Sequence, residues 1–215
     1  MIYADNIADK VAEYLLQVKA IKLQPQQPFT WSSGWKSPIY CDNRVTLSDP
    51  SIRTYIKEQL ADLVRENFFE VDIIVGVATA GIAQGALVAD YLQLPFAYVR
   101  PEPKTHGLGK QIEGAVEAGQ KVVLIEDLIS TGGSSIKAIQ PLVNVGCEVL
   151  GVAAIFDYGF ETARENFKEA GYSYYSLSNY DTLLPVAIKQ GMIRQSDLEV
   201  LRDWRRNPDK WGNRF

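Results

Sequence analysis

Apolar residues at helical spacing mark two segments near the start of the chain. A helix is predicted over residues 4–20, where one face carries Ile7, Val11, Tyr14, Leu15 and Val18. Asp49 and Pro50 suit the first turn of a second helix, whose apolar face carries Ile52, Ile56, Leu60, Leu63 and Val64. Residues 24–44 are rich in proline, serine, glycine and aromatic side chains, which predicts turns and short strands.

The middle of the chain alternates between short apolar runs and helical patterns. Strands are predicted over residues 72–77, 96–99, 121–125 and 149–156. One helix is expected to follow a glycine-dotted turn at residues 76–85 and to end near residue 91, and another to cover residues 134–145. Apolar strands separated by helices predict an α/β fold, with a parallel sheet core flanked by helices on both faces. The tail is expected to hold two more helices, over residues 182–189 and 196–205.

Residues 100–119 interrupt this alternation. They contain Arg100, Lys104, the single histidine His106 and four glycines, with little apolar content. Loops of this length without secondary structure are uncommon, and they usually serve as lids or binding loops or are disordered. Cationic groups on a glycine-rich backbone could gather around a diphosphate and close over it.

Length and composition narrow the functional classes. A chain of 215 residues suffices for one α/β domain with a sizeable core, so a single domain over residues 1–215 is expected. The net charge of −4 disfavours a nucleic-acid partner, because phosphate contacts need clustered lysine and arginine. The apolar runs are too short to span a membrane, and no secretion signal is visible. Two cysteines without metal-binding spacing predict reduced thiols in a cytoplasmic protein.

The strongest functional pattern lies at residues 122–135. Four apolar residues precede Glu126 and Asp127, and a turn of small residues then leads into a helix. In parallel sheets, ligands bind just beyond the carboxyl ends of the strands. Glycine amides, hydroxyl groups and a helix N-terminus suit a phosphate, whereas carboxylates suit sugar hydroxyls or hydrated Mg²⁺. A ribose 5-phosphate satisfies both halves, with its hydroxyls on the acidic pair and its phosphate in the small-residue turn. Besides the acidic pair, the residues expected to bind the sugar diphosphate here are Leu128, Ile129, Ser130, Thr131, Gly132, Gly133 and Ser134.

The alternative for this pattern is an ordinary strand-to-helix turn with an acidic cap. The order of buried strand, acidic pair and small residues favours the binding site, and the absence of a lysine after the glycines excludes the G-x-x-x-x-G-K-[ST] nucleotide loop. The pattern resembles the 5-phosphoribosyl diphosphate signature of type I phosphoribosyltransferases. That resemblance implies a parallel five-stranded core, a flexible lid over about residues 100–119 and a hood over about residues 20–48 that recognises the base. It also implies Mg²⁺ as cofactor, with no direct protein ligand and held near Glu126 and Asp127 mainly through substrate and water.

Two further motifs resemble the parts of this family that contact the diphosphate. Residues 75–82, which include Thr79 and Ala80, resemble the family's diphosphate loop. Arg100, Lys104 and His106 resemble the lid of orotate phosphoribosyltransferases. In that family the lid reaches into the partner subunit's site, which implies a homodimer.

The hood motif concerns the base. Residues 33–40, with the sequence Ser-Gly-Trp-Lys-Ser-Pro-Ile-Tyr, resemble the orotate-binding hood, although an ordinary hairpin with core aromatics would read similarly. The resemblance assigns Lys36, Tyr40 and Ser130 to orotate. The chain departs from the family at four positions where some members carry a basic residue, namely Ser32, Ala80, Pro101 and Tyr158. Ala80 and Pro101 concern the diphosphate, which then depends more on Arg100 and Lys104. The residue at Tyr158 leaves open which groups bind the orotate carboxylate, and Arg44 or hood amides are the alternatives.

Together the motifs predict the transfer of a phosphoribosyl group to orotate, with Lys104, His106 and Asp127 as catalytic residues. A purine or uracil salvage enzyme on the same core is the first alternative, and the hood motif disfavours it. A non-catalytic regulator that binds the same sugar diphosphate is the second, and the acidic net charge disfavours it. A dinucleotide-binding dehydrogenase lacks its G-x-G-x-x-G motif after the first strand.

Overall fold

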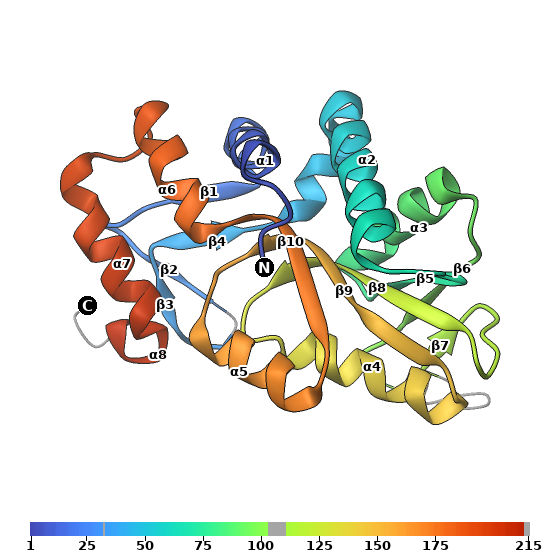
Figure 1. Ribbon diagram of the computed structural model, residues 1–215. Helices are drawn as coiled ribbons and strands as arrows, with labels where there is room; N and C mark the ends of the chain where they lie inside the picture. Colours follow the sequence, from blue (N-terminus) through green and yellow to red (C-terminus); the bar gives the residue numbers. More distant parts are fainter. Residues whose placement is uncertain (32, 103–110, 213–215) are drawn as a thin grey trace.

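The computed structural model describes residues 1–31, 33–102 and 111–212, and a six-stranded sheet forms its centre (Figure 1). The strand order is β10-β9-β8-β5-β6-β7, and all neighbours pair in parallel except β6 and β7. The five parallel strands confirm the predicted core. Their bounds are β5 (Ile73–Val77), β6 (Phe96–Val99), β8 (Lys121–Ile129), β9 (Glu148–Asp157) and β10 (Ser173–Asn179), and the antiparallel edge strand is β7 (Ile112–Glu113).

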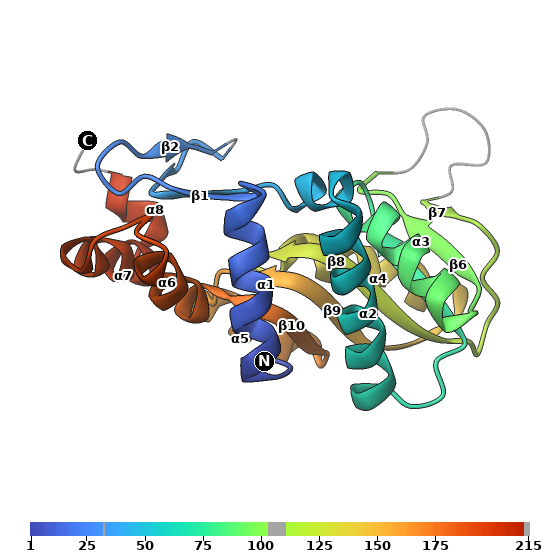
Figure 2. The same cartoon turned by 90° about the horizontal axis from the view of Figure 1, so that it is seen from above.

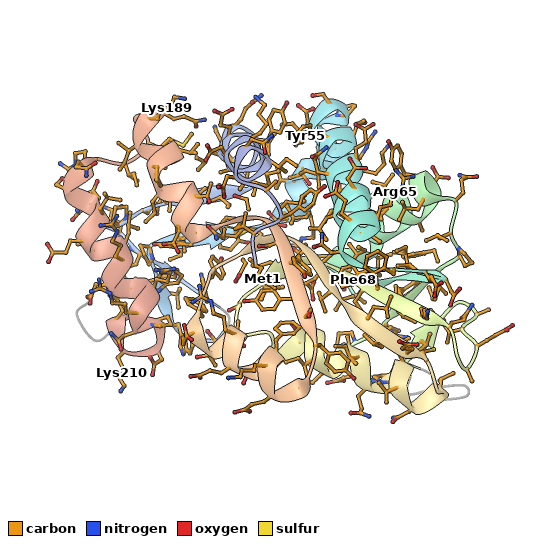
Figure 3. All side chains as sticks on the ribbon, in the orientation of Figure 1. Met1, Tyr55, Arg65, Phe68, Lys189 and Lys210 are labelled. Atoms are coloured by element: carbon orange, nitrogen blue, oxygen red, sulfur yellow. The ribbon has the colours of Figure 1, made fainter. Side chains whose placement is uncertain are left out.

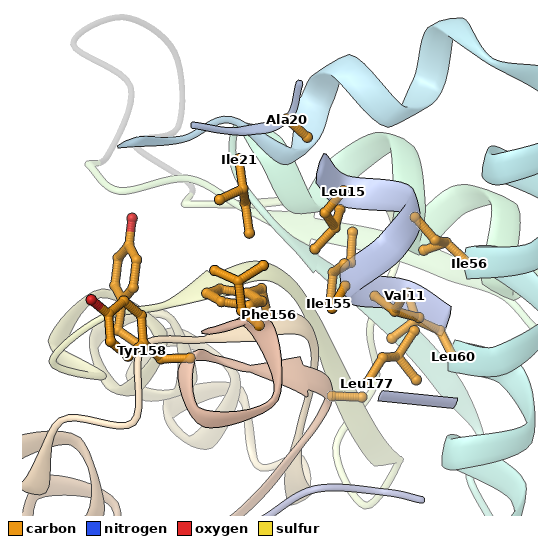
Figure 4. Packing of buried hydrophobic residues seen from close by; sticks show 14 of the residues in the cluster. Val11, Leu15, Ala20, Ile21, Ile56, Leu60, Ile155, Phe156, Tyr158 and Leu177 are labelled. Carbon is orange, nitrogen blue, oxygen red and sulfur yellow. The ribbon is translucent and has the colours of Figure 1, made fainter. Parts of the chain in front are cut away.

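Helices cover both faces of this sheet, as predicted. On one face lie α1 (Asp5–Gln17), α2 (Pro50–Asn67) and α3 (Ala80–Leu92), and on the other lie α4 (Gly133–Val145) and α5 (Glu161–Ala170) (Figures 1 and 2). Side chains alternate along each strand, so Val123 of β8 packs toward the first set while Leu124 packs toward the second. Figure 4 shows the first core, where Leu15, Leu60 and Ile155 are fully buried.

The end of α2 is anchored to the sheet by an aromatic contact. The ring of Phe68 meets Tyr175 of β10 edge-on, with 5.7 Å between the ring centroids. The same ring lies over Gly151 of β9, where an added Cβ would come within 2.7 Å of it (Figure 3). Gly151 pairs with Val123 of β8, three residues before Glu126.

The predicted hood forms two small sheets outside the main one. Strands β1 (Ile21–Leu23) and β4 (Ile39–Cys41) pair antiparallel, as do β2 (Phe29–Thr30) and β3 (Lys36–Ser37), and the 3₁₀ helix η1 (Asn43–Ser48) leads from them to α2. The C-terminal elements lie at the same end of the molecule (Figures 1 and 2). These are α6 (Tyr180–Lys189), η2 (Gln195–Asp197), α7 (Leu198–Arg206) and α8 (Pro208–Trp211).

The structure differs from the predicted elements in four places, one of which is the short helix α8, which was not predicted. β8 continues through the acidic pair to Ile129, because parallel pairing with β9 extends as far as Ile129 and Asp157. Helix α5 and strand β10 were not predicted; α5 buries only Ala163 and Phe167, and the mixed polar and apolar sequence of β10 gives no clear period. Finally, β7 and its pairing with β6 lie within residues 100–119, which were expected to lack strands.

Part of the predicted lid, residues 103–110, lies outside the described residues, as does Ser32. In the described part of the chain, no helix has the length and apolar character needed to cross a membrane. Cys41 and Cys147 are both free thiols.

Candidate active site

The acidic pair lies at the carboxyl end of the central strand β8, between β5 and β9. Alternation along the strand turns the two side chains to opposite faces. Glu126 is 5% exposed, and its carboxylate accepts hydrogen bonds from the Asp127 amide (3.1 Å) and from the Ser135 hydroxyl of α4 (3.2 Å). Asp127 is half-buried on the side of the hood, within range of the charges of Arg44 and Asp42. Asp127 is therefore the more accessible carboxylate of the two.

Burial dominates the electrostatics of this pair. It raises the pKa of Glu126 well above its ordinary value, and the neighbouring Asp127 charge adds to the shift. Burial also raises the pKa of Asp127, against which the Arg44 guanidinium acts in the opposite direction. Two carboxyl groups whose charged forms are disfavoured in the free protein are suited to a ligand that brings positive charge or hydroxyl donors.

The expected phosphate turn, residues 130–133, follows β8 directly. Gly132 has φ +78°, and a Cβ there would lie 2.8 Å from the ring of Phe167, so both conformation and packing require glycine. The turn is held by its carbonyl groups: Ile129 O accepts from the Tyr158 amide (3.0 Å) and Thr131 O accepts from the Asn166 side chain (2.8 Å). The N-cap of α4 is Gly132, which has no side chain to cap the helix, so the amides of its first turn remain suited to an anion.

The expected diphosphate loop lies beside the same strand end. It follows β5 and enters α3, with Thr79 exposed and a cis peptide bond between Ala78 and Thr79. At Gly81 an added Cβ would lie 2.3 Å from the carbonyl oxygen of Ile125, so the first turn of α3 packs directly on β8. The structure thus brings together the diphosphate loop, the acidic pair and the phosphate turn.

An aromatic cleft of about 680 Å³ separates the hood from the phosphate turn. Its wall includes Trp31, whose ring stacks on Tyr158 at 5.2 Å and on Trp35 at 6.4 Å between centroids. Figure 4 shows Tyr158 beside the buried core. The cleft suits a flat ring, and its lining residues come from two regions of the chain: Thr30, Trp31, Ser33, Trp35, Tyr40 and Cys41 of the hood, and Leu128, Ser130, Thr131 and Tyr158 beyond it.

The three residues expected to bind orotate have different positions. Ser130 and Tyr40 line the cleft, and Tyr40 is 40% exposed. Lys36 is not among the lining residues of the cleft. Its ammonium donates to the hydroxyl of Thr30 (2.8 Å), and Thr30 does line the cleft. Arg44, another cation of the hood, is paired with Asp42 at 2.7 Å.

The base of the predicted lid is described, although its tip is not. The Arg100 amide donates to Gln111 O (2.9 Å), which joins the two ends of the segment, and the Arg100 guanidinium lies 3.6 Å from the Glu113 carboxylate. Lys104 and His106 lie outside the described residues.

The sequence did not predict the positions that two residues, Asn43 and Tyr158, occupy in this site. Asn43, which is 1% exposed, donates from its side-chain amide to the main-chain oxygen of Asp127 at 2.6 Å. Tyr158 was noted as a departure from the family and proves to be part of the cleft wall. The hydrogen bond of Asn43 to Asp127 and the stacking of Trp31 on Tyr158 each join segments more than 80 residues apart. No local sequence pattern could therefore have revealed them.

The described residues contain no group of three or more His, Cys, Asp or Glu side chains placed to hold a metal ion. The acidic pair nevertheless offers carboxylate oxygens, the ligand type that Mg²⁺ prefers, and Mg²⁺ commonly keeps several waters and substrate oxygens as its other ligands. Asp127, the more accessible carboxylate of the pair, therefore fits a Mg²⁺ ion held chiefly by substrate and water.

Comparison with known proteins identifies relatives over nearly the whole chain. The family profile of the phosphoribosyl transferase domain matches residues 47–176. Orotate phosphoribosyltransferase of Bacteroides thetaiotaomicron is 54% identical over 206 residues, which covers 96% of this chain and 97% of that protein. The enzyme of the same name from Phocaeicola vulgatus is 56% identical, covering 93% and 94%. The crystal structure of orotate phosphoribosyltransferase from Aeropyrum pernix superposes with a TM-score of 0.74 at 31% identity, covering 86% of this chain and 99% of that one.

Proposed function

Since the chain belongs to the orotate phosphoribosyltransferase family, we propose that it transfers the phosphoribosyl group of 5-phosphoribosyl 1-diphosphate to orotate. The products are orotidine 5′-monophosphate and diphosphate, a step in the de novo biosynthesis of pyrimidine nucleotides and thus of UMP. The observation that carries this proposal is the meeting of an acidic strand end, a phosphate turn and an aromatic cleft around β8.

The sugar diphosphate binds along the carboxyl ends of β5 and β8. Asp127, with Glu126 behind it, receives the ribose hydroxyls, and residues 128–134 receive the 5′-phosphate through main-chain amides and hydroxyls. Thr79 and Ala80 present main-chain amides to the diphosphate. Arg100 approaches it from the base of the lid, and its weak 3.6 Å pairing with Glu113 leaves it available for an anion.

Orotate occupies the aromatic cleft. Tyr40 and the Trp31 wall contact the flat ring, and Ser130 lies where the base and the phosphoribosyl group meet. Lys36 supplies positive charge for the carboxylate of orotate, after its ammonium exchanges the Thr30 hydroxyl for the ligand. This arrangement orients the ring nitrogen N1 toward C1 of the ribose.

In the reaction the bond between C1 and the diphosphate oxygen breaks, and N1 of orotate forms the new bond with its lone pair. The proton that N1 carries is lost to the departing diphosphate. The ribose becomes oxocarbenium-like on the way, as in glycoside cleavage. The Asp127 carboxylate stabilises the developing positive charge while it holds the hydroxyls. Bound Mg²⁺ would offset the charge of the diphosphate. Lys104 and His106 complete the neutralisation of the leaving group, and the closed lid keeps water from the activated sugar.

The proposal also includes the oligomeric state of the protein. Lys104 and His106 act on the site of the partner subunit in a homodimer of cytoplasmic, single-domain chains. Sedimentation analysis should give twice the chain mass of 24.0 kDa.

An absorbance assay tests the function. With Mg²⁺ and the sugar diphosphate present, orotate should be consumed, whereas uracil, hypoxanthine and adenine should not. The aromatic cleft alone would admit any of these rings, so selectivity for orotate depends on its carboxylate. Consumption of a purine or of uracil at a rate equal to that of orotate would contradict the proposal.

A further inference from the structure

A chain of buried polar side chains runs behind the site and joins three of its elements. Gln84 of α3 donates to the Thr46 hydroxyl (3.2 Å), and that hydroxyl donates to the main-chain oxygen of Asn43 (2.6 Å). Asn43 in turn donates from its side-chain amide to the main-chain oxygen of Asp127 (2.6 Å). The three side chains are 2%, 0% and 1% exposed, so water does not compete for these hydrogen bonds.

The orientation of the Asn43 amide follows from its two partners. The carbonyl oxygen of Asp127 can only accept, so the NH₂ group must face it. The amide oxygen then faces the Cys41 thiol, which donates to it at 3.3 Å. Asn43 is thus fixed from the hood strand β4 on one side and fixes the end of β8 on the other.

The chain connects the three expected parts of the ligand. Thr46 and Asn43 lie in η1, directly after the hood, and α3 begins at the diphosphate loop. Asp127 is the carboxylate assigned to the ribose. Asn43, Thr46 and Gln84 are not among the lining residues of the aromatic cleft, so any influence on the reaction is indirect, through contacts such as those with Asp127 and Cys41.

Stability alone does not explain a polar chain at this position. Buried polar groups are costly unless fully paired, and apolar side chains of the same shape often stabilise a core equally well. One acceptor is in fact unpaired among the described residues, because Oε1 of Gln84 is buried without a partner. Directional hydrogen bonds are instead suited to holding a main-chain segment in one place.

We propose that Asn43, Thr46 and Gln84 are positioning residues, which hold the Asp127 end of β8 in place relative to the hood and the diphosphate loop. The inference deepens the proposed function and rests on the assignment of Asp127 to the ribose. Displacement of a catalytic group by about 1 Å can lower turnover about 100-fold.

The first test replaces Asn43 by leucine, which has the same branched heavy-atom skeleton and no donor. Asn43→Leu should lower kcat roughly 10- to 100-fold. It should also weaken the binding of 5-phosphoribosyl 1-diphosphate, measured by calorimetry without orotate, by about tenfold. Ser178→Ala is the matched control, because the Ser178 hydroxyl is fully buried and donates to Ala8 O of α1 at 2.9 Å, on the edge strand β10, which β9 separates from β8. It should lose comparable stability but keep kcat and affinity within about twofold.

A second pair of variants guards against a misfolded Asn43→Leu protein. Thr46→Ser keeps the hydroxyl and loses a methyl group, whereas Thr46→Val keeps the shape and loses the hydroxyl. A positioning role predicts normal kcat for the serine variant and reduced kcat for the valine variant, whichever of the two is more stable. Equal kcat in both, or wild-type affinity for the sugar diphosphate in folded Asn43→Leu, would overturn the inference. Since that affinity is measured without orotate, failure here is distinguishable from failure of the orotate reaction itself.

Discussion

The phosphate turn and the aromatic cleft adjoin at the same strand end, where Ser130 and Thr131 belong to both, but they are built in opposite ways. The turn uses contiguous residues after β8, and its ligand-binding groups are expected to be main-chain amides. The cleft draws its wall from Trp31 of the hood and Tyr158 beyond β9, with Trp204 of α7 meeting both rings edge-on at 5.6 and 5.7 Å. A local sequence can encode the first site by itself, whereas the second exists only when distant segments fold together.

The two regions also differ in what they contribute to stability. Trp31, Tyr158 and Trp204 bury large rings against one another, so the cleft wall is part of the folded core. The acidic pair lowers stability instead, because burial raises the pKa of both carboxyl groups and so disfavours their charged forms. Substitutions should therefore separate function from stability at the strand end and damage both in the cleft.

The largest effect is expected at Asp127. Asp127→Asn keeps the shape of the side chain and removes the charge that stabilises the oxocarbenium-like ribose. Turnover should fall about 100- to 1,000-fold, while the folded state is maintained. Steady-state rates with orotate and thermal unfolding of the same sample check both parts. A variant with near-normal turnover would remove Asp127 from the chemistry and leave the strand end as a binding surface only.

A smaller and more selective effect is expected in the cleft. Trp31→Leu removes the stacking on Tyr158 and the indole donor to Ile39 O (3.0 Å). The KM for orotate should rise about tenfold and the unfolding free energy should fall by about 2 kcal/mol, with little change in affinity for the sugar diphosphate.

The matched control for the cleft is Phe68→Leu, which disrupts an edge-on pair with Tyr175 away from the site. It should lose similar stability without a change in the KM for orotate. If both variants raised that KM equally, the aromatic wall would have no specific role in binding the base.

This contrast explains how far the sequence could predict the molecule. Apolar runs and glycine turns predicted the five-stranded parallel core apart from β10, together with the strand end, the acidic pair and both loops. Strand β10 was not predicted, because its mixed sequence is stabilised by pairing with β9 and with residues near Met1, and these are tertiary contacts. The hydrogen bond of Asn43 to Asp127 and the position of the Tyr158 ring in the cleft were not predicted either, because they too are tertiary contacts. The roles of Lys104 and His106 remain predictions outside the described residues.

The smallest effect sharpens the comparison at Glu126. Burial and the Asp127 charge raise the pKa of Glu126, so the folded state favours its neutral form. Below the ordinary pKa of about 4.5 both folded and unfolded states are protonated, and the full stability is present. As the pH rises, the unfolded state ionises first, and stability is lost until the raised pKa of the folded state is reached. Each pKa unit of difference corresponds to about 1.4 kcal/mol.

Glu126→Gln is neutral at every pH and should escape this loss. Its unfolding free energy should match that of the wild type near pH 4 and exceed it by at least about 1 kcal/mol at pH 8. Denaturant unfolding at several pH values measures the difference, and Glu165→Gln, which removes an exposed carboxylate of α5, should follow the wild type throughout. If the Glu126→Gln difference stayed constant with pH, the buried carboxyl would not be the cause. If the difference grows with pH and turnover of Glu126→Gln is reduced, the buried carboxyl group at the strand end lowers stability and contributes to function. The aromatic rings of the cleft, in contrast, contribute to both.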